Sequence, residues 1–373
     1  MGRIKVLHII GGGEFGGAEQ HLLTLIKEID RSEFELHIAC LFAEPLAPLV
    51  DKAGFPAHIV PMRSKFDWKP IGNLASLIKM EGFHIVHTHG VRANLIGRLA
   101  AKRAGVTHIV TTVHSVLTFD YNRWADRWIN RLCEFGTRGS TELFITVCDK
   151  LAFELAKEGV PKEKIFIIHN GLELEKYNSD ISGKPIRQEF GIADDRIVMG
   201  IIARLHPVKG HTYLLEALAQ AVKKVPSLLL MIVGTGPDRA MLEEKCRELA
   251  LDGNVVFTGF RRDVPEILAS LDFLVLPSLS EGLSLTIMEG MAMKKPVLAT
   301  AVGGTPEIIT HQVDGYLVPP ADTDALAAGI LHLAGEPGKI RDMGLAARRT
   351  IEAGFTSVLM ADKTTEIYKD LCL

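Results

Sequence analysis

Short apolar runs alternate with amphipathic stretches along the whole chain, a pattern typical of βα units built on a parallel sheet. Several runs are rich in Val, Ile and Leu without strict alternation, as expected for strands that helices cover on both faces. In the first half, the predicted strands are Lys5–Ile10, Glu35–Leu41, Ala57–Val60, Ile85–Thr88, His108–Val113, Leu143–Val147 and Ile165–Ile168. In the second half, they are Ile197–Ala203, Ser227–Val233, Val255–Thr258, Phe273–Pro277, Val297–Ala299 and Gly315–Val318. The predicted helices include Ala18–Glu28, Ala93–Ala104, Leu151–Lys157, Thr212–Lys223 and Asp238–Leu249.

The strand–helix pattern is interrupted once, near residues 173–186, where turn-forming residues cluster in Tyr177–Asp180 and Ser182–Pro185. A length of 373 residues also favours two domains over one or four. We therefore predict an α/β fold with two doubly wound, Rossmann-like domains, residues 1–180 and 181–356. A helical stretch, Ser357–Leu371, follows the last strand of the second domain.

Composition narrows the class of protein. Apolar residues make up 47% and charged residues 23%, as in ordinary globular proteins. The apolar runs are strand-sized, so no transmembrane helix is expected, and residues 4–17 do not resemble a signal peptide. Five scattered cysteines without a Cys-x-x-Cys motif fit a reducing cytoplasm and argue against a disulfide framework or a zinc site. The net charge of −3 provides no basic field for nucleic acid.

A glycine-rich segment, Gly11–Gly17, follows the first predicted strand and precedes a helix. Gly11, Gly13 and Gly16 match the G-x-G-x-x-G spacing, which indicates dinucleotide binding. That fingerprint also requires an acidic residue at the end of the second strand, whereas Glu44 lies beyond it. The segment therefore leaves two interpretations open, a place where a ligand approaches backbone amides or a tight βα turn.

Two basic residues, Arg204 and Lys209, lie in the turn after the first strand of the second domain. Open α/β sheets bind ligands at the carboxyl ends of their strands. Two cations at that edge can hold a pyrophosphate without a metal ion. A solvated pair without function would have the same spacing.

Two carboxylates are eight residues apart at the start of another helix, Glu281 in the loop and Glu289 about two turns inside. Successive residues of an α-helix are rotated by ~100°, so a residue eight positions later points within ~80° of the first. The two carboxylates can therefore face one side of a cleft. Carboxylates accept hydrogen bonds from vicinal hydroxyls, and the amides around Ser284 and Leu285 form a helix N-terminus suited to phosphate. A buried glutamate needs a partner, which a ligand hydroxyl can supply. The alternative is one surface glutamate and one salt-bridged glutamate.

Two further motifs resemble metal ligands. His87 and His89 lie at a strand end, but alternate residues on a strand point to opposite faces. We therefore expect no metal site there and leave open a role toward an acceptor. Asp322 and Asp324 mimic a D-x-D motif, but they precede a helical stretch and are better interpreted as helix-start carboxylates.

A basic and aromatic segment, Arg123–Leu132, repeats arginine at positions 123, 127 and 131 beside Trp124 and Trp128. Basic residues with interfacial tryptophans suit an anionic membrane surface. A domain-packing helix with solvated arginines explains the pattern equally well.

Taken in order, these segments resemble the retaining GT-B glycosyltransferases of family 4. The E-x7-E motif of that family matches Glu281 to Glu289, and its phosphate clamp matches Arg204 and Lys209. Further matches are Gly16–Glu19, His114, His169–Gly171, Gly234–Pro237, Thr300–Ile308 and Asp314–Val318. The chain departs from the family pattern at Gly290, where alanine is common, and at Lys294-Lys295-Pro296 in place of Gly-x-Pro.

The resemblance implies two domains facing each other across a cleft, with helix 357–373 packing back on the first domain. It implies transfer of a hexosyl unit, with retention, from a nucleotide sugar such as UDP- or GDP-hexose, without a metal ion or another cofactor. The acceptor would be a sugar or a lipid-linked molecule in bacterial-type polysaccharide, lipopolysaccharide or glycolipid synthesis. The expected location is cytoplasmic, with contact at the inner face of the plasma membrane as a further expectation.

The resemblance also assigns roles. Glu281 would hold the donor sugar, Glu289 the ribose, and Arg204 with Lys209 the leaving diphosphate. The expected catalytic residues are Glu281, Arg204, Lys209 and His114, and the expected donor-binding residues are Gly16, Gly17, Gly234, Gly282, Ser284, Leu285 and Glu289. Three alternatives are a nucleotide-sugar epimerase of the same fold, an NAD-dependent oxidoreductase and a non-catalytic sugar-binding protein.

Overall fold

The computed structural model describes residues 2–13, 15–64, 67–115, 124–335 and 337–373. The chain divides into two compact units, unit 1 with residues 1–171 and 357–373, and unit 2 with residues 172–356. The sequence-based boundary after residue 180 falls inside unit 2. The segment around Tyr177 belongs there because its carbonyl accepts a 2.8 Å hydrogen bond from the Arg348 guanidinium. At the start of that segment, the Leu172 amide donates to the Phe355 carbonyl at 2.9 Å.

Unit 1 is built on a parallel sheet of seven strands in the order β3-β2-β1-β4-β5-β6-β7. The strands are β1 (Ile4–Ile10), β2 (Phe34–Cys40), β3 (Ala57–Ile59), β4 (Ile85–His89), β5 (His108–Val113), β6 (Leu143–Thr146) and β7 (Ile165–Ile167). Its helices are α1 (Gly17–Glu28), α2 (Ala47–Lys52), α3 (Lys69–Glu81), α4 (Val91–Ala104), α5 (Trp124–Arg138), α6 (Asp149–Lys157) and α15 (Ser357–Cys372), with a 3-10 turn at Lys162–Lys164. Because all strands are parallel, their carboxyl ends meet at one edge.

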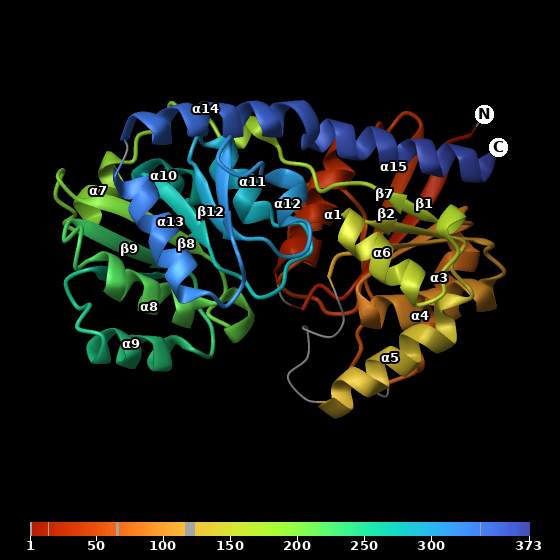
Figure 1. The fold of residues 1–373 in the computed structure, drawn as a ribbon. Coiled ribbons are helices and arrows are strands. Elements are labelled where there is room, and N and C mark those ends of the chain that lie inside the picture. Colours follow the sequence, from red (N-terminus) through yellow and green to blue (C-terminus); the bar gives the residue numbers. More distant parts are fainter. Residues whose placement is uncertain (1, 14, 65–66, 116–123, 336) are drawn as a thin grey trace. The chain divides into compact units, whose positions relative to one another are not determined.

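Helix α15 completes the core of unit 1 although it comes from the other end of the chain. It lies against α1, along the top of unit 1 in Figure 1. Met360, Ala361, Ile367 and Tyr368 are buried in the same apolar cluster as the residues of β1, α1 and β2. The amphipathic pattern of this helix is therefore satisfied by packing on unit 1.

Unit 2 repeats the architecture with six parallel strands in the order β10-β9-β8-β11-β12-β13. The strands are β8 (Ile197–Ile202), β9 (Leu228–Val233), β10 (Val255–Gly259), β11 (Phe273–Leu276), β12 (Val297–Thr300) and β13 (Gly315–Val318). The helices are α7 (Lys184–Glu189), α8 (His211–Ala221), α9 (Arg239–Glu248), α10 (Val264–Ser270), α11 (Leu285–Ala292), α12 (Thr305–Ile308), α13 (Thr323–Gly335) and α14 (Pro337–Gly354), with 3-10 turns at Leu174–Lys176 and Pro207–Lys209. Helices α8 and α13 pack side by side (Figure 1). The predicted α/β class, with two parallel sheets flanked by helices, is confirmed.

Candidate active site

The carboxyl edge of the unit 2 sheet brings two predicted residues into direct contact. Lys209 ends the 3-10 turn after β8, and Glu281 lies in the loop after β11. The Lys209 Nζ donates to Glu281 Oε1 at 2.6 Å, and the exposed fractions of these side chains are only 25% and 10%. Arg204, from the same β8 loop, is exposed. The cation and the carboxylate are therefore neighbours, which the sequence did not predict.

Close packing of two loops holds that ion pair. The Leu279 amide after β11 donates to the Val208 carbonyl after β8 at 2.7 Å. Gly210 adopts φ +70°, and a Cβ there would lie 2.0 Å from the Pro277 carbonyl oxygen. Since another side chain would separate the loops, glycine at this position keeps Lys209 beside Glu281.

The loop after β12 supports Glu281 from another direction. The Gly304 amide donates to the Gly282 carbonyl at 2.7 Å. Gly303 adopts φ +55°, and a Cβ there would lie 1.9 Å from the Glu281 carbonyl oxygen. This close approach gives the predicted Thr300–Ile308 motif a structural role in positioning Glu281.

Helix α11 begins next to this loop and carries Glu289. Ser284 caps it, its hydroxyl accepting a 3.4 Å hydrogen bond from the Ile287 amide, and Leu285 is the first helical residue. The pKa of the Glu289 carboxyl is raised, because burial disfavours its charged form. The Tyr177 hydroxyl donates a 2.7 Å hydrogen bond to Glu289 Oε1, which offsets part of this rise. The predicted need of a buried glutamate for a partner is therefore met within the protein by the Tyr177 hydroxyl.

Tyr177 is a site residue that sequence reasoning missed. It was interpreted only as part of an interdomain turn, and it lies 112 residues from Glu289 in sequence. Arg348 donates to the carbonyls of Tyr177 and Ala292, at 2.8 and 2.9 Å, and so holds the segment against α11. Burial raises the pKa of Tyr177, which keeps its hydroxyl protonated as a donor to Glu289.

Gly234, the other predicted donor-binding residue of unit 2, lies at the end of β9. A Cβ at this position would lie 2.1 Å from the Ala203 carbonyl oxygen. The Leu205 amide donates to the Thr235 carbonyl at 2.9 Å, so the β8 and β9 loops are packed backbone to backbone. Backbone packing is thus sufficient to explain this glycine.

On unit 1, Gly16 and Gly17 lie exposed at the N-terminus of α1. A Cβ on Gly17 would meet none of the described atoms within 4 Å. The Glu19 carboxylate accepts a 3.1 Å hydrogen bond from the Gly16 amide. The segment therefore forms a capped helix start whose Gly17 backbone a ligand can approach.

Five histidines gather at the carboxyl edge of the unit 1 sheet, from β1, β4, the end of β5 and α1: His8, His21, His87, His89 and His114. The rings of His87 and His89 lie with centroids 4.3 Å apart, on one face of β4. The expectation that these two residues point to opposite faces is wrong, because residues i and i+2 share a face and only consecutive residues alternate.

The histidine cluster is uncharged at neutral pH. Burial lowers the pKa of His8 to about 3 and that of His21 to about 4. Burial and the neighbouring rings also hold the pKa values of His87, His89 and His114 well below the ordinary value. His21 Nδ1 lies 2.9 Å from Asn170 Oδ1, within the predicted His169–Gly171 motif.

Two subsets of these histidines have the spacing of a metal site. The ligand atoms of His8, His87 and His89, and those of His21, His89 and His114, lie within 4.8 Å of one another. The geometric argument against a metal site at His87 and His89 is therefore wrong. The expectation that catalysis needs no metal stays a prediction.

The D-x-D motif behaves as a helix start, as expected. Asp322 Oδ1 accepts a 2.9 Å hydrogen bond from the Ala325 amide at the first turn of α13. Asp324 Oδ1 accepts one from the Gln220 side chain, also at 2.9 Å. Both carboxylates therefore accept hydrogen bonds within unit 2, Asp322 from the first turn of α13 and Asp324 from α8.

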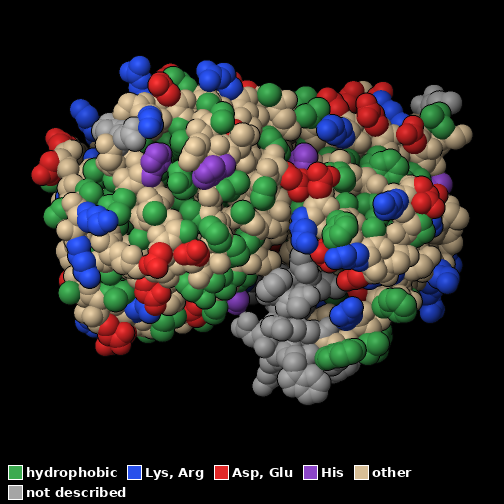
Figure 2. Space-filling view, in the orientation of Figure 1, with side chains coloured by type: hydrophobic (Ala, Val, Ile, Leu, Met, Phe, Trp, Pro, Cys, Tyr) green, Lys and Arg blue, Asp and Glu red, His purple; other side chains and the backbone are tan. Residues whose placement is uncertain are grey.

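From Trp124 onward, the predicted basic and aromatic segment lies in α5. Arg123 and the side chains of Trp124 and Arg127 lie outside the described residues. Within the described part, Trp128, Leu132 and Phe135 are 60%, 65% and 69% exposed. Figure 2 shows hydrophobic side chains at the surface over α5. Among the described residues, no helix is long and apolar enough to span a membrane.

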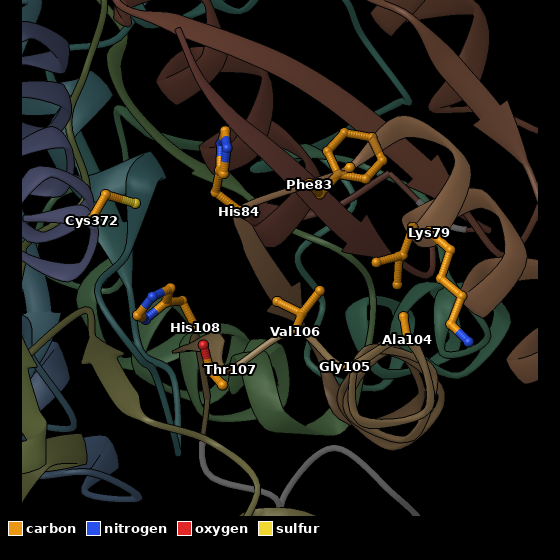
Figure 3. A pocket seen from close by; sticks show the side chains of 11 residues that line it. Lys79, Phe83, His84, Ala104, Gly105, Val106, Thr107, His108 and Cys372 are labelled. Carbon is orange, nitrogen blue, oxygen red and sulfur yellow. The ribbon is translucent and has the colours of Figure 1, made fainter. Parts of the chain in front are cut away.

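A separate cavity of about 470 Å³ lies at the opposite, amino-terminal edge of the unit 1 sheet. His84 and Phe83 before β4, Val106 before β5, and Cys372 of α15 line it (Figure 3). It contains none of the predicted site residues, and open α/β sheets bind their ligands at the other edge.

The chain matches two protein-family models. Residues 15–176 match the model described as Glycosyltransferase Family 4, and residues 196–336 match that of Glycosyl transferases group 1. A relative from Escherichia coli, UDP-Gal:alpha-D-GlcNAc-diphosphoundecaprenol alpha-1,3-galactosyltransferase, is 26% identical over 99% of this chain and 97% of its own length. N-acetyl-alpha-D-glucosaminyl L-malate synthase from Bacillus anthracis is 28% identical over 82% and 80%.

The fold also matches solved structures. The crystal structure of Anabaena HepE with UDP and glucose superposes with a TM-score of 0.87 at 23% identity, covering 99% of this chain and 100% of that one. These comparisons give no support to the epimerase or the NAD-dependent alternative. The two family models span both halves of the sequence, and the chain belongs to the GT-B glycosyltransferases of family 4, which transfer a sugar from a nucleotide-sugar donor.

Proposed function

We propose that this glycosyltransferase moves a hexosyl unit, with retention of anomeric configuration, from a nucleoside diphosphate hexose to a sugar or lipid-linked acceptor. The contact between Lys209 and Glu281, 2.6 Å long, carries the proposal. In such a donor the outer phosphate is bonded to the anomeric position of the sugar. A cation for the phosphate and an acceptor for sugar hydroxyls must therefore be neighbours, as these two side chains are.

Each of the other candidate residues is assigned a separate role. Arg204 and Lys209 stabilise the negative charge that develops on the leaving diphosphate. Glu281 accepts hydrogen bonds from the sugar, and Glu289, oriented by Tyr177, accepts them from the ribose. On unit 1, we assign ligand contacts to His114, Gly16 and Gly17, which are partly or fully exposed.

Uridine is the base that the comparisons favour. The E. coli relative is named for UDP-Gal, and the Anabaena structure holds UDP and glucose. A thermal-shift screen of UDP, GDP and ADP with their hexoses tests this choice, because a ligand that binds the folded state raises its stability. We expect the largest shift with a uridine compound, and a larger shift with GDP compounds would reject uridine.

Product analysis tests the reaction itself. With a UDP-hexose and a diphosphate-linked lipid acceptor, we expect an acceptor enlarged by one hexose, whose anomeric proton coupling reports the same configuration as the donor. An inverted product would contradict retention. A changed or released sugar without any glycosylated acceptor would favour an epimerase.

The proposed reaction uses no metal ion. The two basic side chains supply the charge neutralisation, while Asp322 of the D-x-D motif caps α13 and Asp324 accepts a hydrogen bond from Gln220. Activity should persist in EDTA. Complete loss in EDTA, restored by magnesium or manganese, would contradict this part of the proposal.

A lipid-linked acceptor implies contact with the inner face of the plasma membrane by an otherwise cytoplasmic enzyme. Helix α5 supplies a surface for it, since the exposed Trp128, Leu132 and Phe135 lie beside the exposed Arg131. Tryptophan and basic residues together favour the anionic interface.

Liposome co-sedimentation tests the membrane contact. Binding should increase with the fraction of anionic lipid and fall in a Trp128→Ser/Arg131→Glu double variant. Trp68→Ser is the matched control, because Trp68 is 54% exposed on the same unit but lies before α3. Equal, negligible pelleting of all three proteins would contradict the membrane contact.

A further inference from the structure

Three histidines of unit 1 form a continuous hydrogen-bonded row from the core to the carboxyl edge of the sheet. His8 Nδ1 lies 3.0 Å from His89 Nε2, and His89 Nδ1 lies 3.2 Å from His114 Nε2. His8 and His89 are 0% and 1% exposed, whereas His114 is partly exposed at the end of the row. The parallel strands β1, β4 and β5 are neighbours in the sheet, β1 and β4 carry His8 and His89, and His114 directly follows β5.

The row permits only two arrangements of protons. A neutral imidazole has one N–H donor and one acceptor nitrogen. The two links therefore require either that all three rings carry the proton on Nδ1 or that all three carry it on Nε2. The choice made at His8 sets the tautomer of His114.

The inner end of the row distinguishes the two arrangements. His8 Nε2 is buried and has no hydrogen-bond partner among the described residues. An N–H at that nitrogen would be a buried donor without an acceptor, which is rare in folded proteins. In the Nδ1–H arrangement, His8 Nε2 has only an unused lone pair. The protons of His8 and His89 then lie in the two hydrogen bonds of the row, and the proton of His114 lies at its outer end.

We propose that His8 and His89 are positioning residues that fix His114 as its Nδ1–H tautomer. The outer nitrogen of His114 is then a neutral hydrogen-bond donor. If His114 contacts the ligand, as proposed above, its Nδ1–H donates a hydrogen bond to an oxygen atom of the ligand, such as a sugar hydroxyl or a phosphate oxygen. This consequence rests on the proposed function.

His87 lies in the same cluster outside the row and provides an internal control. Its Nε2 lies 2.7 Å from Thr112 Oγ1, and its Nδ1 is hydrogen-bonded to the Tyr368 hydroxyl. Removing that hydroxyl perturbs the cluster without changing either link of the row.

Histidine tautomers can be measured directly by long-range ¹H–¹⁵N NMR on the full chain labelled at histidine. In the parent protein without ligand, we expect the Nδ1 of His8, His89 and His114 to be protonated. Observation of protonated Nε2 at His114 would overturn the proposal. Spectra after addition of Zn²⁺ test the metal alternative, and zinc-bound signals from His8 and His89 at equimolar zinc would also overturn it.

Variants test whether His8 determines the tautomer. His8→Leu removes the donor to His89, and we expect His114 to shift toward Nε2–H, the form that free histidine prefers. His8→Asn places an amide N–H near the original Nδ1 and should restore the parent spectrum. Tyr368→Phe should leave the His114 tautomer unchanged. An unchanged His114 tautomer in a folded His8→Leu protein would overturn the proposal.

Kinetics separate this inference from the proposed function. If about one fifth of His8→Leu molecules keep the competent tautomer, kcat/KM falls about fivefold, and His8→Asn recovers most of it. His114→Ala removes the donor itself. If His114 is Nδ1–H but His114→Ala transfers sugar at the parent rate, the row of histidines stands and the proposed role of His114 fails.

Discussion

The two units place different chemistry on the same framework. Each positions its candidate residues at the carboxyl edge of a parallel sheet. Unit 2 presents opposite charges, with Lys209 on Glu281, whereas unit 1 presents a cluster of histidines whose lowered pKa values keep them neutral at pH 7. The difference shows that one architecture can present charged or uncharged side chains at the same edge of its sheet, depending on a few residues in its strands and in the segments that follow them.

The energetic consequences also differ between the units. Lys209 and Glu281 of unit 2 are paired with each other and remain partly accessible, so a charged ligand can replace either side chain as the partner of the other. The rings of unit 1 are buried, so protonating one of them carries a cost of desolvation. Unit 2 should therefore respond mainly to changes of charge, and unit 1 to changes of pH and tautomer.

The largest expected effect is loss of the charge at Lys209 or Arg204. Lys209→Ala and Arg204→Ala should each lower kcat/KM by ~10²-fold or more, because each removes a cation that stabilises the leaving diphosphate. Steady-state kinetics measure this. Lys245→Ala is the matched control, since its Nζ pairs with Glu216 at the same 2.6 Å but joins α9 to α8. Parent-like rates within threefold in both test variants would rule out the clamp.

The sequence predicted the parts of the site that follow one another along the chain. Every predicted strand is present to within one or two residues, and Lys209, Glu281, Ser284 and Glu289 lie in the predicted loops and helix. The residues that were missed join distant segments. Tyr368 reaches His87 across 281 positions, and Tyr177 reaches Glu289 across 112. Such contacts depend on strand order and on the return of α15, which local patterns do not encode.

The two glutamates of unit 2 should separate in calorimetric titration with a nucleoside diphosphate. Glu289→Gln replaces a ribose acceptor, and since hydrogen bonds to charged groups contribute roughly 1.5–3 kcal/mol, affinity should fall by about one to two orders of magnitude. Glu281→Gln should bind the diphosphate almost normally and lose turnover, because Glu281 orients the sugar that this ligand lacks. The reverse result would exchange the two assignments.

A smaller effect, specific to unit 1, is expected from pH. The folded-state pKa values of His8 and His21 are about 3 and about 4, below the ordinary value of 6.5. As pH falls below 6.5, the histidines of the unfolded chain take up protons before those of the folded chain do. The free energy of unfolding therefore keeps decreasing until the pH reaches the folded-state pKa values. At pH 5 the loss is about 2 kcal/mol for each such histidine.

Urea unfolding of the full chain at pH 7 and pH 5 measures this loss. His8→Asn should lose about 2 kcal/mol less than the parent between the two pH values, because one titrating group has been removed. Equal losses in the His8 variant and the parent would show that His8 is charged in the folded state.

The smallest expected effect compares two buried tyrosines, one in each unit. Tyr177 donates to Glu289 at 2.7 Å, and Tyr368 is hydrogen-bonded to His87. Tyr177→Phe removes one hydrogen bond of roughly 0.5–1.5 kcal/mol, so affinity for a nucleoside diphosphate should fall about two- to tenfold. Tyr368→Phe makes the same chemical change in the neutral cluster and should leave that affinity within error of the parent. Calorimetry on both variants gives the comparison.

If Tyr177→Phe binds normally while Glu289→Gln does not, the carboxylate holds the ribose without the tyrosine. If Tyr368→Phe weakens binding as strongly, the neutral cluster contributes to diphosphate binding, and the division of charged and neutral chemistry between the units is wrong.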